Sequence, residues 1–314
     1  MIPCSKCGER SVVFVRYSGR HLCAEHLMAF VEGRVAKEVR SSGKLPKGSK
    51  IACAVSGGKD STAMLHILRG LFHMCSGITL HAIIVDEGIC GYRPHGIEVA
   101  ERECSRLGIE LAIVRLEELF GYTLDEAVER MPKTIPCTIC GVWRRAALNR
   151  TAKRLGAARL ALGHNLNDFA GSVLMNVCRA DVERFARMGP HEDVQPGLVP
   201  RLLPLRLVPE EEVMLYSWLK GWKVLDAECP YAMRSDRNRF VRLIAALEDR
   251  TPGTRHSIAR FWEETRGAVL RSHPQAALMG CERCGEPTAS SACRACALAE
   301  AVRRAQGFNI REGI

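Results

Sequence analysis

The sequence lacks several features that define whole classes of protein. Aromatic residues make up only 6% of its 314 residues. No uncharged apolar run approaches the ~20 residues that a helix needs to span a bilayer. The N-terminus, Met1-Ile2-Pro3-Cys4, has no basic segment followed by an apolar core, so no secretion signal is expected. We therefore expect a cytoplasmic protein with no membrane partner.

Acidic residues are also scarce relative to basic ones. The chain has 35 Asp plus Glu against 45 Lys plus Arg, and its formal net charge is +10. Such an excess favours a polyanionic partner, because basic side chains contact phosphates and release counterions. A general bias toward arginine would produce the same charge, so the charge supports a nucleic-acid partner without proving one. Hydrophobic residues make up 47% of the chain, enough to bury a folded core.

Cysteine, by contrast, is abundant, with 15 residues. A reducing cytoplasm works against a disulfide framework, so metal binding is the better interpretation. Two sets at the ends of the chain have the spacing of zinc ligands: Cys4, Cys7, Cys23 and His26 form C-x2-C-x15-C-x2-H, and Cys281, Cys284, Cys293 and Cys296 form C-x2-C-x8-C-x2-C. Four protein ligands leave no open position, which indicates two structural zinc ribbons and not catalytic metal.

A third cysteine set lies in the middle of the chain. Cys137 and Cys140 form a C-x2-C pair just before a predicted basic helix, and no second pair lies nearby. Cys229, in Glu228-Cys229-Pro230-Tyr231, is the natural third thiolate. Three thiolates suit an iron–sulfur cluster with one iron left open. The competing interpretation is redox chemistry through a persulfide or a disulfide, and spacing alone leaves both open.

From Ile51 onward, short apolar runs alternate with helical stretches. The runs are Ile51–Val55, Leu80–Val85, Ile109–Val114 and Leu160–Leu162. This alternation is typical of a parallel, doubly wound sheet, so we expect an α/β fold. The main helices are expected at Arg34–Arg40, from Ser61 onward, and at Ile97–Leu107, Trp143–Lys153 and Glu210–Lys220. Ligands of such sheets bind at the carboxyl ends of the strands, where polar residues follow the runs.

A glycine-rich segment, Ser56-Gly57-Gly58-Lys59-Asp60-Ser61, follows the first run and opens a helix. Glycine lets the backbone approach phosphate oxygens, and the amides at the start of the helix favour an anion. A Walker A loop is excluded, because it would need glycine at Cys53 and Ser or Thr at Asp60. The sequence therefore predicts a phosphate-binding loop of another kind.

We expect four units along the chain. Residues 1–32 would form an N-terminal zinc ribbon and residues 33–50 a linker helix. Residues 51–272 would form the α/β domain, and residues 273–314 a C-terminal zinc ribbon with a tail.

Taken together, these motifs resemble one family. The chain carries the S-G-G-x-D-S loop of the ATP pyrophosphatase superfamily. It then carries, in one order, Cys137-Thr138-Ile139-Cys140-Gly141-Val142-x-Arg144-Arg145, Gly163-His164-Asn165, Leu174-Met175-Asn176 and Glu228-Cys229-Pro230-Tyr231. With two terminal ribbons, it is similar to the two-zinc-ribbon group of tRNA 2-thiouridine synthetases. The resemblance implies a PP-loop domain of the adenine nucleotide alpha-hydrolase-like fold.

The resemblance also implies cofactors, partners and site residues. The cofactors are ATP, Mg²⁺, two structural zinc ions and one [4Fe–4S] cluster held by Cys137, Cys140 and Cys229. ATP contacts are expected at Ala54, Ser56, Gly57, Gly58, Lys59, Asp60, Ser61, Val85, Gly163, His164 and Asp168. The catalytic group comprises the three cluster cysteines with Lys59, Asp60 and Asp168. The partners are tRNA and a sulfur source, either a ubiquitin-like thiocarboxylate protein or inorganic sulfide. A homodimer through the terminal ribbons is a separate hypothesis, which no sequence feature demonstrates.

In this family the uridine C2 oxygen is adenylated by ATP and then replaced by sulfur. Details such as Gly91-Tyr92-Arg93 look more like the branch acting on wobble uridine 34 than the branch acting on position 54 of the T-loop. The chain departs from the family at Asn167 and Phe169, where acidic residues are frequent, and Asp168 alone is retained.

Two other function classes compete with thiolation. Related PP-loop enzymes aminate or ligate, but those reactions need no sulfur carrier and would not explain the third cysteine set. A zinc-ribbon RNA-binding scaffold without catalysis would not explain the phosphate loop, and ATP-to-AMP turnover dependent on tRNA would exclude it.

Overall fold

The central sheet has five parallel strands in the order β5-β4-β3-β6-β7. The computed structural model describes residues 2–73, 77–192 and 194–305. The strands are β3 (Lys50–Val55), β4 (Thr79–Asp86), β5 (Glu110–Arg115), β6 (Ala157–Leu162) and β7 (Arg201–Leu202). The four expected strands are therefore confirmed, and β7 is an addition. The strand order reverses direction between β3 and β6, which is where ligands of doubly wound sheets bind.

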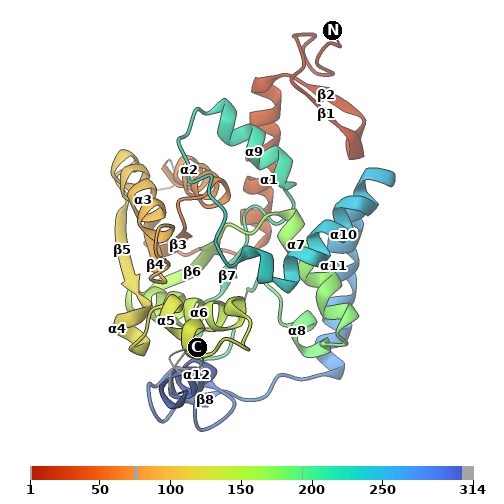
Figure 1. The fold of residues 1–314 in the computed structure, drawn as a ribbon. Helices are drawn as coiled ribbons and strands as arrows, with labels where there is room; N and C mark the ends of the chain where they lie inside the picture. The colour runs from red at the N-terminus through yellow and green to blue at the C-terminus, as the bar shows by residue number, and fades with distance from the viewer. Residues whose placement is uncertain (1, 74–76, 193, 306–314) are drawn as a thin grey trace, which may run out of the picture.

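Helices cover both faces of this sheet (Figure 1). One face packs against α1 (Ala24–Ser41), α2 (Lys59–His73), α3 (Arg93–Leu107) and α9 (Glu210–Leu219), and the other against α4 (Leu116–Phe120), α5 (Leu124–Arg130) and α6 (Pro136–Arg154). The strands alternate their side chains between the two cores: Ile51 and Cys53 point into the first, and Ala52 into the second. The expected doubly wound α/β architecture is thus confirmed.

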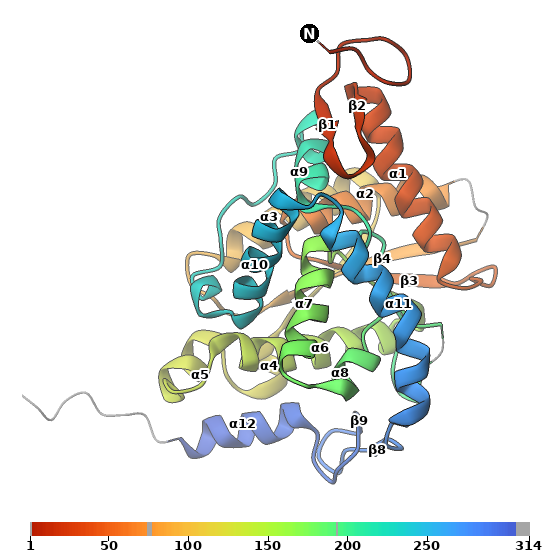
Figure 2. The same cartoon turned by 90° about the vertical axis from the view of Figure 1, so that its right-hand side faces the viewer.

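A further group of helices lies beside the sheet. It comprises α7 (Leu166–Cys178), α8 (Val182–Ala186), α10 (Asp236–Arg250) and α11 (Thr254–Ser272), which Figure 2 shows standing next to one another. Phe169 of α7 packs edge-on against the buried Trp262 of α11, with ring centroids 5.0 Å apart. Because α7 follows directly on β6, this packing fixes the helix that leaves the carboxyl end of that strand.

The two ends of the chain form small cysteine-rich units. The first contains the hairpin β1 (Val13–Val15) and β2 (Arg20–Leu22), and the second contains β8 (Met279–Gly280), β9 (Pro287–Thr288) and α12 (Arg294–Arg304). Helix α1 begins directly after Cys23, so the boundary expected between residues 32 and 33 lies inside it. The part of the expected C-terminal unit beyond residue 305 lies outside the described residues.

A buried ion pair joins α1 to the segment after β7. Arg206 donates from Nε and Nη2 to the two carboxylate oxygens of Glu38, each at 2.9 Å, and both residues are less than 5% exposed. Replacing Arg206 by alanine would leave the Glu38 carboxylate buried without its partner. We expect the variant to lose about 3–5 kcal/mol of unfolding free energy, measured by urea denaturation.

The matched control for this variant is Arg187→Ala. Arg187 pairs with Glu183 at 3.2 Å, and more than half of each side chain is exposed. Because an exposed pair of this kind contributes at most about 1 kcal/mol, its loss is expected to be small. Equal destabilisation by the two variants would contradict a structural role for the Arg206–Glu38 pair.

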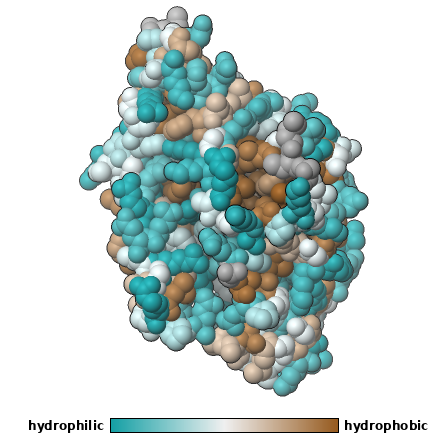
Figure 3. All heavy atoms as spheres, turned by 180° about the vertical axis from the view of Figure 1, so that it is seen from behind, coloured by the Kyte–Doolittle hydropathy of each residue, from teal (hydrophilic) through white to brown (hydrophobic). Residues whose placement is uncertain are grey.

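The molecular surface is mixed in character. Seen from behind, hydrophilic side chains surround a patch of apolar ones (Figure 3). Within the described ranges, every helix is too short or too polar to cross a lipid bilayer.

Candidate functional site

The glycine-rich segment forms a tight loop between β3 and α2. The Ser61 hydroxyl accepts a hydrogen bond from the Ser56 N–H at 3.0 Å and donates one to the Gly58 carbonyl at 3.1 Å. These bonds hold the loop closed on itself at the first turn of the helix. The amides at this turn have no intrahelical acceptor, so the loop is suited to bind an anion.

Two glycines let this loop pack directly on helix α3. Gly57 has φ of +83°, and a Cβ at this position would lie 2.5 Å from the carbonyl oxygen of Gly96. A Cβ on Gly96 would in turn lie 2.6 Å from the Ser56 carbonyl oxygen. Neither position can therefore carry a side chain, and the close approach fixes where the loop stands at the end of β3.

The cationic side chain of the loop is surrounded by carboxylates. Lys59 Nζ lies 3.0 Å from Asp60 Oδ2 and 2.8 Å from Glu210 Oε1. Burial lowers the pKa of Lys59, but these carboxylates outweigh it and the pKa is raised, so the ammonium group is retained. Burial raises the pKa of Asp60, which also accepts a hydrogen bond from Asn165 Nδ2 at 3.0 Å.

Glu210 was not anticipated from the sequence as a site residue. It lies 151 residues from Lys59, at the start of α9, and its other carboxylate oxygen accepts from Asn167 Nδ2 at 3.4 Å. The resembled family often has an acidic residue at the position of Asn167. Here Asn167 instead contacts the carboxylate of Glu210, which belongs to helix α9. Only the tertiary fold brings these groups together, so no local pattern could have indicated Glu210.

The remaining residues expected around the nucleotide lie at the ends of β3, β4 and β6. Ala54 and Val85 are the next-to-last residues of β3 and β4. A Cβ on Gly163 would be 3.0 Å from Ser61 Cα, so β6 also ends against the loop. Burial lowers the pKa of His164 to about 4, which makes it neutral at physiological pH. Asp168 lies one turn into α7, and its Oδ1 is 3.5 Å from Arg237 Nη1.

Both terminal sets of four expected ligands come together in space. The ligand atoms of Cys4, Cys7, Cys23 and His26 lie within 4.8 Å of one another, and so do those of Cys281, Cys284, Cys293 and Cys296. In the second set, the Cys293 N–H donates to Cys281 Sγ at 3.2 Å, and this bond is the largest of those that lower the pKa of Cys281 to about 6. Amide donors to sulfur favour the thiolate, the form that binds metal.

The third cysteine set is divided between a helix and a loop. Helix α6 begins at Pro136, so Cys137 and Cys140 lie in its first turns. The expectation from the sequence that they lie just before the helix is therefore wrong. Proline at the first helical position is a start signal that the sequence contained. Cys137 Sγ lies 3.9 Å from the carbonyl oxygen of Tyr231, two residues beyond Cys229. The fold therefore brings Cys229 to the N-terminus of the helix that carries the other two cysteines.

These three thiols are suited to hold a cationic group. Burial raises the pKa of Cys140 to about 11 and also raises the pKa of Cys229, so both keep their protons at neutral pH unless a metal replaces them. Their sulfurs do not form a compact group like those of the ribbons in the described part of the chain. A cluster of several iron atoms holds its ligands farther apart than a single zinc ion does, so the set fits an iron–sulfur cluster.

A buried network connects this cysteine set to the phosphate loop. Arg93 donates from Nη1 to the Ser56 carbonyl oxygen at 3.2 Å, and its Nε contacts Glu87 Oε2. The other oxygen of Glu87 lies 3.8 Å from Arg144 Nη1. Cys140 is the largest influence on the pKa of Arg144, which is raised. Arg93 and Glu87 are at most 4% exposed, and neither was predicted as part of the site.

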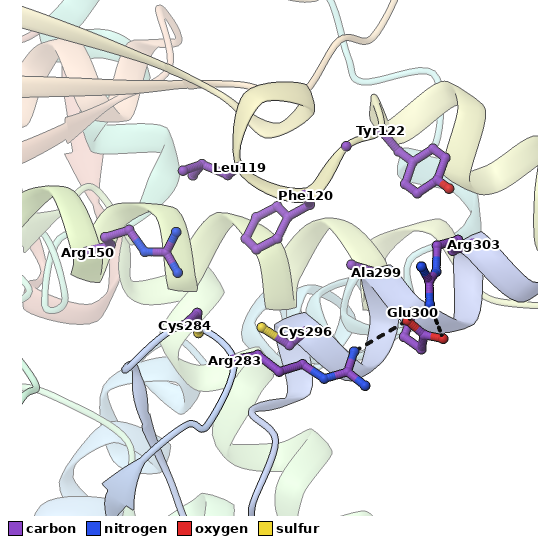
Figure 4. Close-up of a pocket in the computed structure, with 11 residues that line it drawn as sticks. Leu119, Phe120, Tyr122, Arg150, Arg283, Cys284, Cys296, Ala299, Glu300 and Arg303 are labelled. Atoms are coloured by element: carbon purple, nitrogen blue, oxygen red, sulfur yellow. Dashed lines mark hydrogen bonds and ion pairs between the residues drawn. The ribbon is translucent and has the colours of Figure 1, made fainter.

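A cavity in the described part of the chain lies away from these residues. It has a volume of about 640 Å³ and lies between the C-terminal ribbon and helices α4 and α6. Figure 4 shows Arg150, Arg283 and Arg303 around it, with Arg283 and Arg303 both directed at Glu300. Cys284 and Cys296 also line it. Because neither the phosphate loop nor Cys137, Cys140 and Cys229 reach this cavity, it is not the site described above.

The chain matches two family models. Residues 31–245 match the PP-loop domain, and residues 4–28 match the N-terminal LIM domain of the 2-thiouridine synthetase TtuA. The tRNA 2-thiolation protein NcsA of Haloferax volcanii is 38% identical over 96% of this chain and 99% of its own length. Cytoplasmic tRNA 2-thiolation protein 1 of Drosophila erecta is 35% identical over 96% of this chain and 88% of its own.

A solved structure agrees with these sequence matches. The U34-tRNA thiolase NcsA from Methanococcus maripaludis, determined with its [4Fe–4S] cluster, superimposes with a TM-score of 0.82 at 33% identity, covering 96% of both chains. The expected resemblance and fold are thereby confirmed. The chain belongs to the family of PP-loop tRNA 2-thiolation enzymes.

Proposed function

We propose that the protein is an ATP-dependent tRNA uridine 2-sulfurtransferase. The observation that carries the proposal is the network from the Ser56 carbonyl through Arg93 and Glu87 to Arg144, beside Cys140. It joins a loop suited to phosphate to a cysteine set suited to a sulfur-carrying cluster. A reaction that activates a base with ATP and then adds sulfur requires both at one place.

The phosphate loop would perform the activation. Its amides and Lys59 would bind the triphosphate, and Asp60 and Asp168 would hold Mg²⁺. Ala54, Val85, Gly163 and His164 would surround the nucleoside. The uridine O2 attacks the α-phosphate, a P–O bond forms, and pyrophosphate leaves. Fixed positive groups stabilise the charge that develops on the phosphate oxygens. The result is an AMP leaving group at C2 in place of a carbonyl oxygen.

The three cysteines would supply the sulfur. Cys137, Cys140 and Cys229 would hold an iron–sulfur cluster, which would supply sulfur at the sulfide level of oxidation, because three protein thiolates do not fill all of its ligand positions. Replacement of the C2–O bond by a C2–S bond releases AMP with the original oxygen, so the exchange involves no net oxidation. The sulfur would come from a ubiquitin-like thiocarboxylate protein or from inorganic sulfide.

The substrate is proposed to be wobble uridine 34 of tRNA. This assignment rests on the similarity to the U34-tRNA thiolase NcsA over nearly the whole chain. The alternative is uridine or thymidine 54 of the T-loop, the target of the other branch of the resembled family. The same catalytic residues would serve either target.

The ribbons complete the proposal. Each would hold one structural zinc ion, because its four ligands leave no open position. We further propose a cytoplasmic location, in line with relatives named as cytoplasmic, and a homodimer formed through the ribbons, which sedimentation analysis would test.

Position-resolved nucleoside mass spectrometry tests the function directly. In tRNA from a strain that lacks this protein, we expect 2-thiouridine to be lost at position 34 and retained in the parent strain. Loss only at position 54 would keep the chemistry and change the target. Unchanged thiolation at both positions would contradict the proposal. If, in addition, the purified protein bound tRNA but converted no ATP to AMP in its presence, an RNA-binding scaffold would be the better account.

A further inference from the structure

Arginines from four elements converge beside the cysteine helix. Arg145 of α6 has Arg201 of β7, Arg144 of α6, Arg184 of α8 and Arg237 of α10 as its charged neighbours. In Figure 1, α6 lies on one side of this region, and α7, α8 and α10 lie on the other. The five residues are separated by up to 93 positions in the sequence, so the fold alone assembles them.

Three of these arginines have carboxylate partners. Arg184 pairs with Asp181 at 3.3 Å, Arg237 with Asp168 at 3.5 Å, and Arg144 faces Glu87 at 3.8 Å. The guanidinium groups of Arg145 and Arg201 contact no acceptor among the residues that the structure describes. The cluster therefore has an excess of positive charge, and two of its planar donor groups are left without partners.

The unpaired arginines do not serve the cysteines. Cys140 has the largest effect on the pKa of Arg144. The charged groups that shift the pKa of Arg145 are arginines instead. Arg145 nevertheless lies close by, because its Nη1 is 3.2 Å from the position that a Cβ on Gly141 would occupy, and Gly141 follows Cys140. Arg145 therefore borders the cysteine site.

Bringing like charges together in this way costs free energy. Burial, followed by the charge of Arg201, lowers the pKa of Arg145 to about 10, and burial also lowers the pKa of Arg201. Both groups still carry a proton at neutral pH. Arg145 combines this desolvation with an exposed side chain, so a ligand can reach its guanidinium group. A bound anion would offset the repulsion between the two guanidinium groups and would accept hydrogen bonds from the N–H donors of both.

We propose that Arg145 and Arg201 form a binding site for a phosphodiester group of the RNA strand, next to the nucleotide that reaches Cys137, Cys140 and Cys229. The inference rests on the proposed function and adds to it how the strand is held. A planar guanidinium matches phosphate with two parallel hydrogen bonds, and RNA presents one phosphate per nucleotide. The phosphates of ATP already have the amides of the Ser56–Ser61 loop and Lys59.

Filter binding of tRNA to the full-length holoprotein tests this site. Arg145→Gln and Arg201→Gln are each expected to weaken tRNA binding about 10-fold, the loss typical of one charge-assisted contact. The slope of log K against log salt should fall by about 0.7–0.9 for each variant, because one fewer counterion is released. ATP affinity should stay at the wild-type value, and thermal stability should not fall, because each change removes a repulsive charge.

The matched control is Arg154→Gln, which removes the same charge from the exposed end of the same helix. It should change the affinity and the salt slope far less. Arg145→Lys keeps the charge but loses the planar fork, so it should retain the salt slope while binding more weakly than wild type.

Three outcomes would overturn the inference. First, Arg145→Gln and Arg201→Gln could bind tRNA with the same affinity as Arg154→Gln, which would show that the two arginines are ordinary solvent-exposed residues. A loss of ATP affinity instead would assign the pair to the nucleotide. A loss of thiolation only with a protein sulfur donor, and not with sulfide, would assign it to that donor. If wild-type protein itself neither binds nor thiolates tRNA, the proposed function fails first.

Discussion

Replacing Cys229 by alanine is expected to abolish 2-thiouridine formation while leaving ATP binding unchanged. Cys229 stands at the N-terminus of α6 beside Cys137 and Cys140, and its removal would leave two thiols where a cluster needs three. The phosphate loop lies on other elements and should keep its geometry. Thiolated nucleosides measured by mass spectrometry, the visible absorbance of the purified protein and ATP titration would report the three properties separately.

Cys178→Ala is the matched control for this experiment. Cys178 is exposed at the end of α7 and has no place in the three metal-binding sets. Its removal should leave both the absorbance and the thiolation activity at wild-type levels. Full thiolation by the Cys229→Ala variant would exclude a cluster held by these three cysteines.

Replacing Gly57 by alanine is expected to weaken ATP binding about 10- to 100-fold. The new Cβ would lie 2.5 Å from the carbonyl oxygen and 2.7 Å from the Cα of Gly96, and neither backbone atom can move independently of α3. The residue would also be forced to keep φ of +83°. Strain of this kind costs about 1–3 kcal/mol, and each 1.4 kcal/mol corresponds to a tenfold change in affinity. Isothermal titration calorimetry with ATP gives the affinity.

Gly58→Ala separates this steric effect from a general loss of loop flexibility. Gly58 has no positive φ, and the nearest atom to its added Cβ would be Ser56 Oγ at 3.6 Å, an ordinary contact. We expect a much smaller loss of affinity than in Gly57→Ala. Equal losses in both variants would show that flexibility, and not the close approach of α3, makes glycine necessary at position 57.

The parts of the fold that follow a local pattern could be predicted from the sequence. Strands that are buried on both faces of a sheet are continuously apolar, so they can be found as apolar runs. Each of the four expected runs overlaps one strand of the central sheet: Ile51–Val55, Leu80–Val85, Ile109–Val114 and Leu160–Leu162. The phosphate loop and both sets of ribbon ligands have fixed spacings that set their geometry directly. These features were therefore visible without any tertiary information.

Other features have no local pattern. Strand β7 is only two residues long and lies between Pro200 and Pro204, too short for any periodicity. Glu210 reaches Lys59 across 151 residues, and Arg93 joins Ser56 to Glu87 from a helix whose start was expected at Ile97. Charged pairs of this kind depend on how helices pack, so their members look like ordinary surface residues in the sequence.

The contact between α6 and the C-terminal ribbon has a consequence for synthesis on the ribosome. The buried Trp143 indole, stacked on Phe120, donates its hydrogen bond to the carbonyl of Ala295, 152 residues later in the chain. At a synthesis rate of about 5–20 residues per second, roughly 8–30 s pass before that partner is made. During this interval Trp143 can pack on Phe120, but its indole N–H lacks its final acceptor. The contact that joins the cysteine helix to the C-terminal ribbon therefore forms only after Ala295 has been synthesised, later than the packing of α6 on the central sheet.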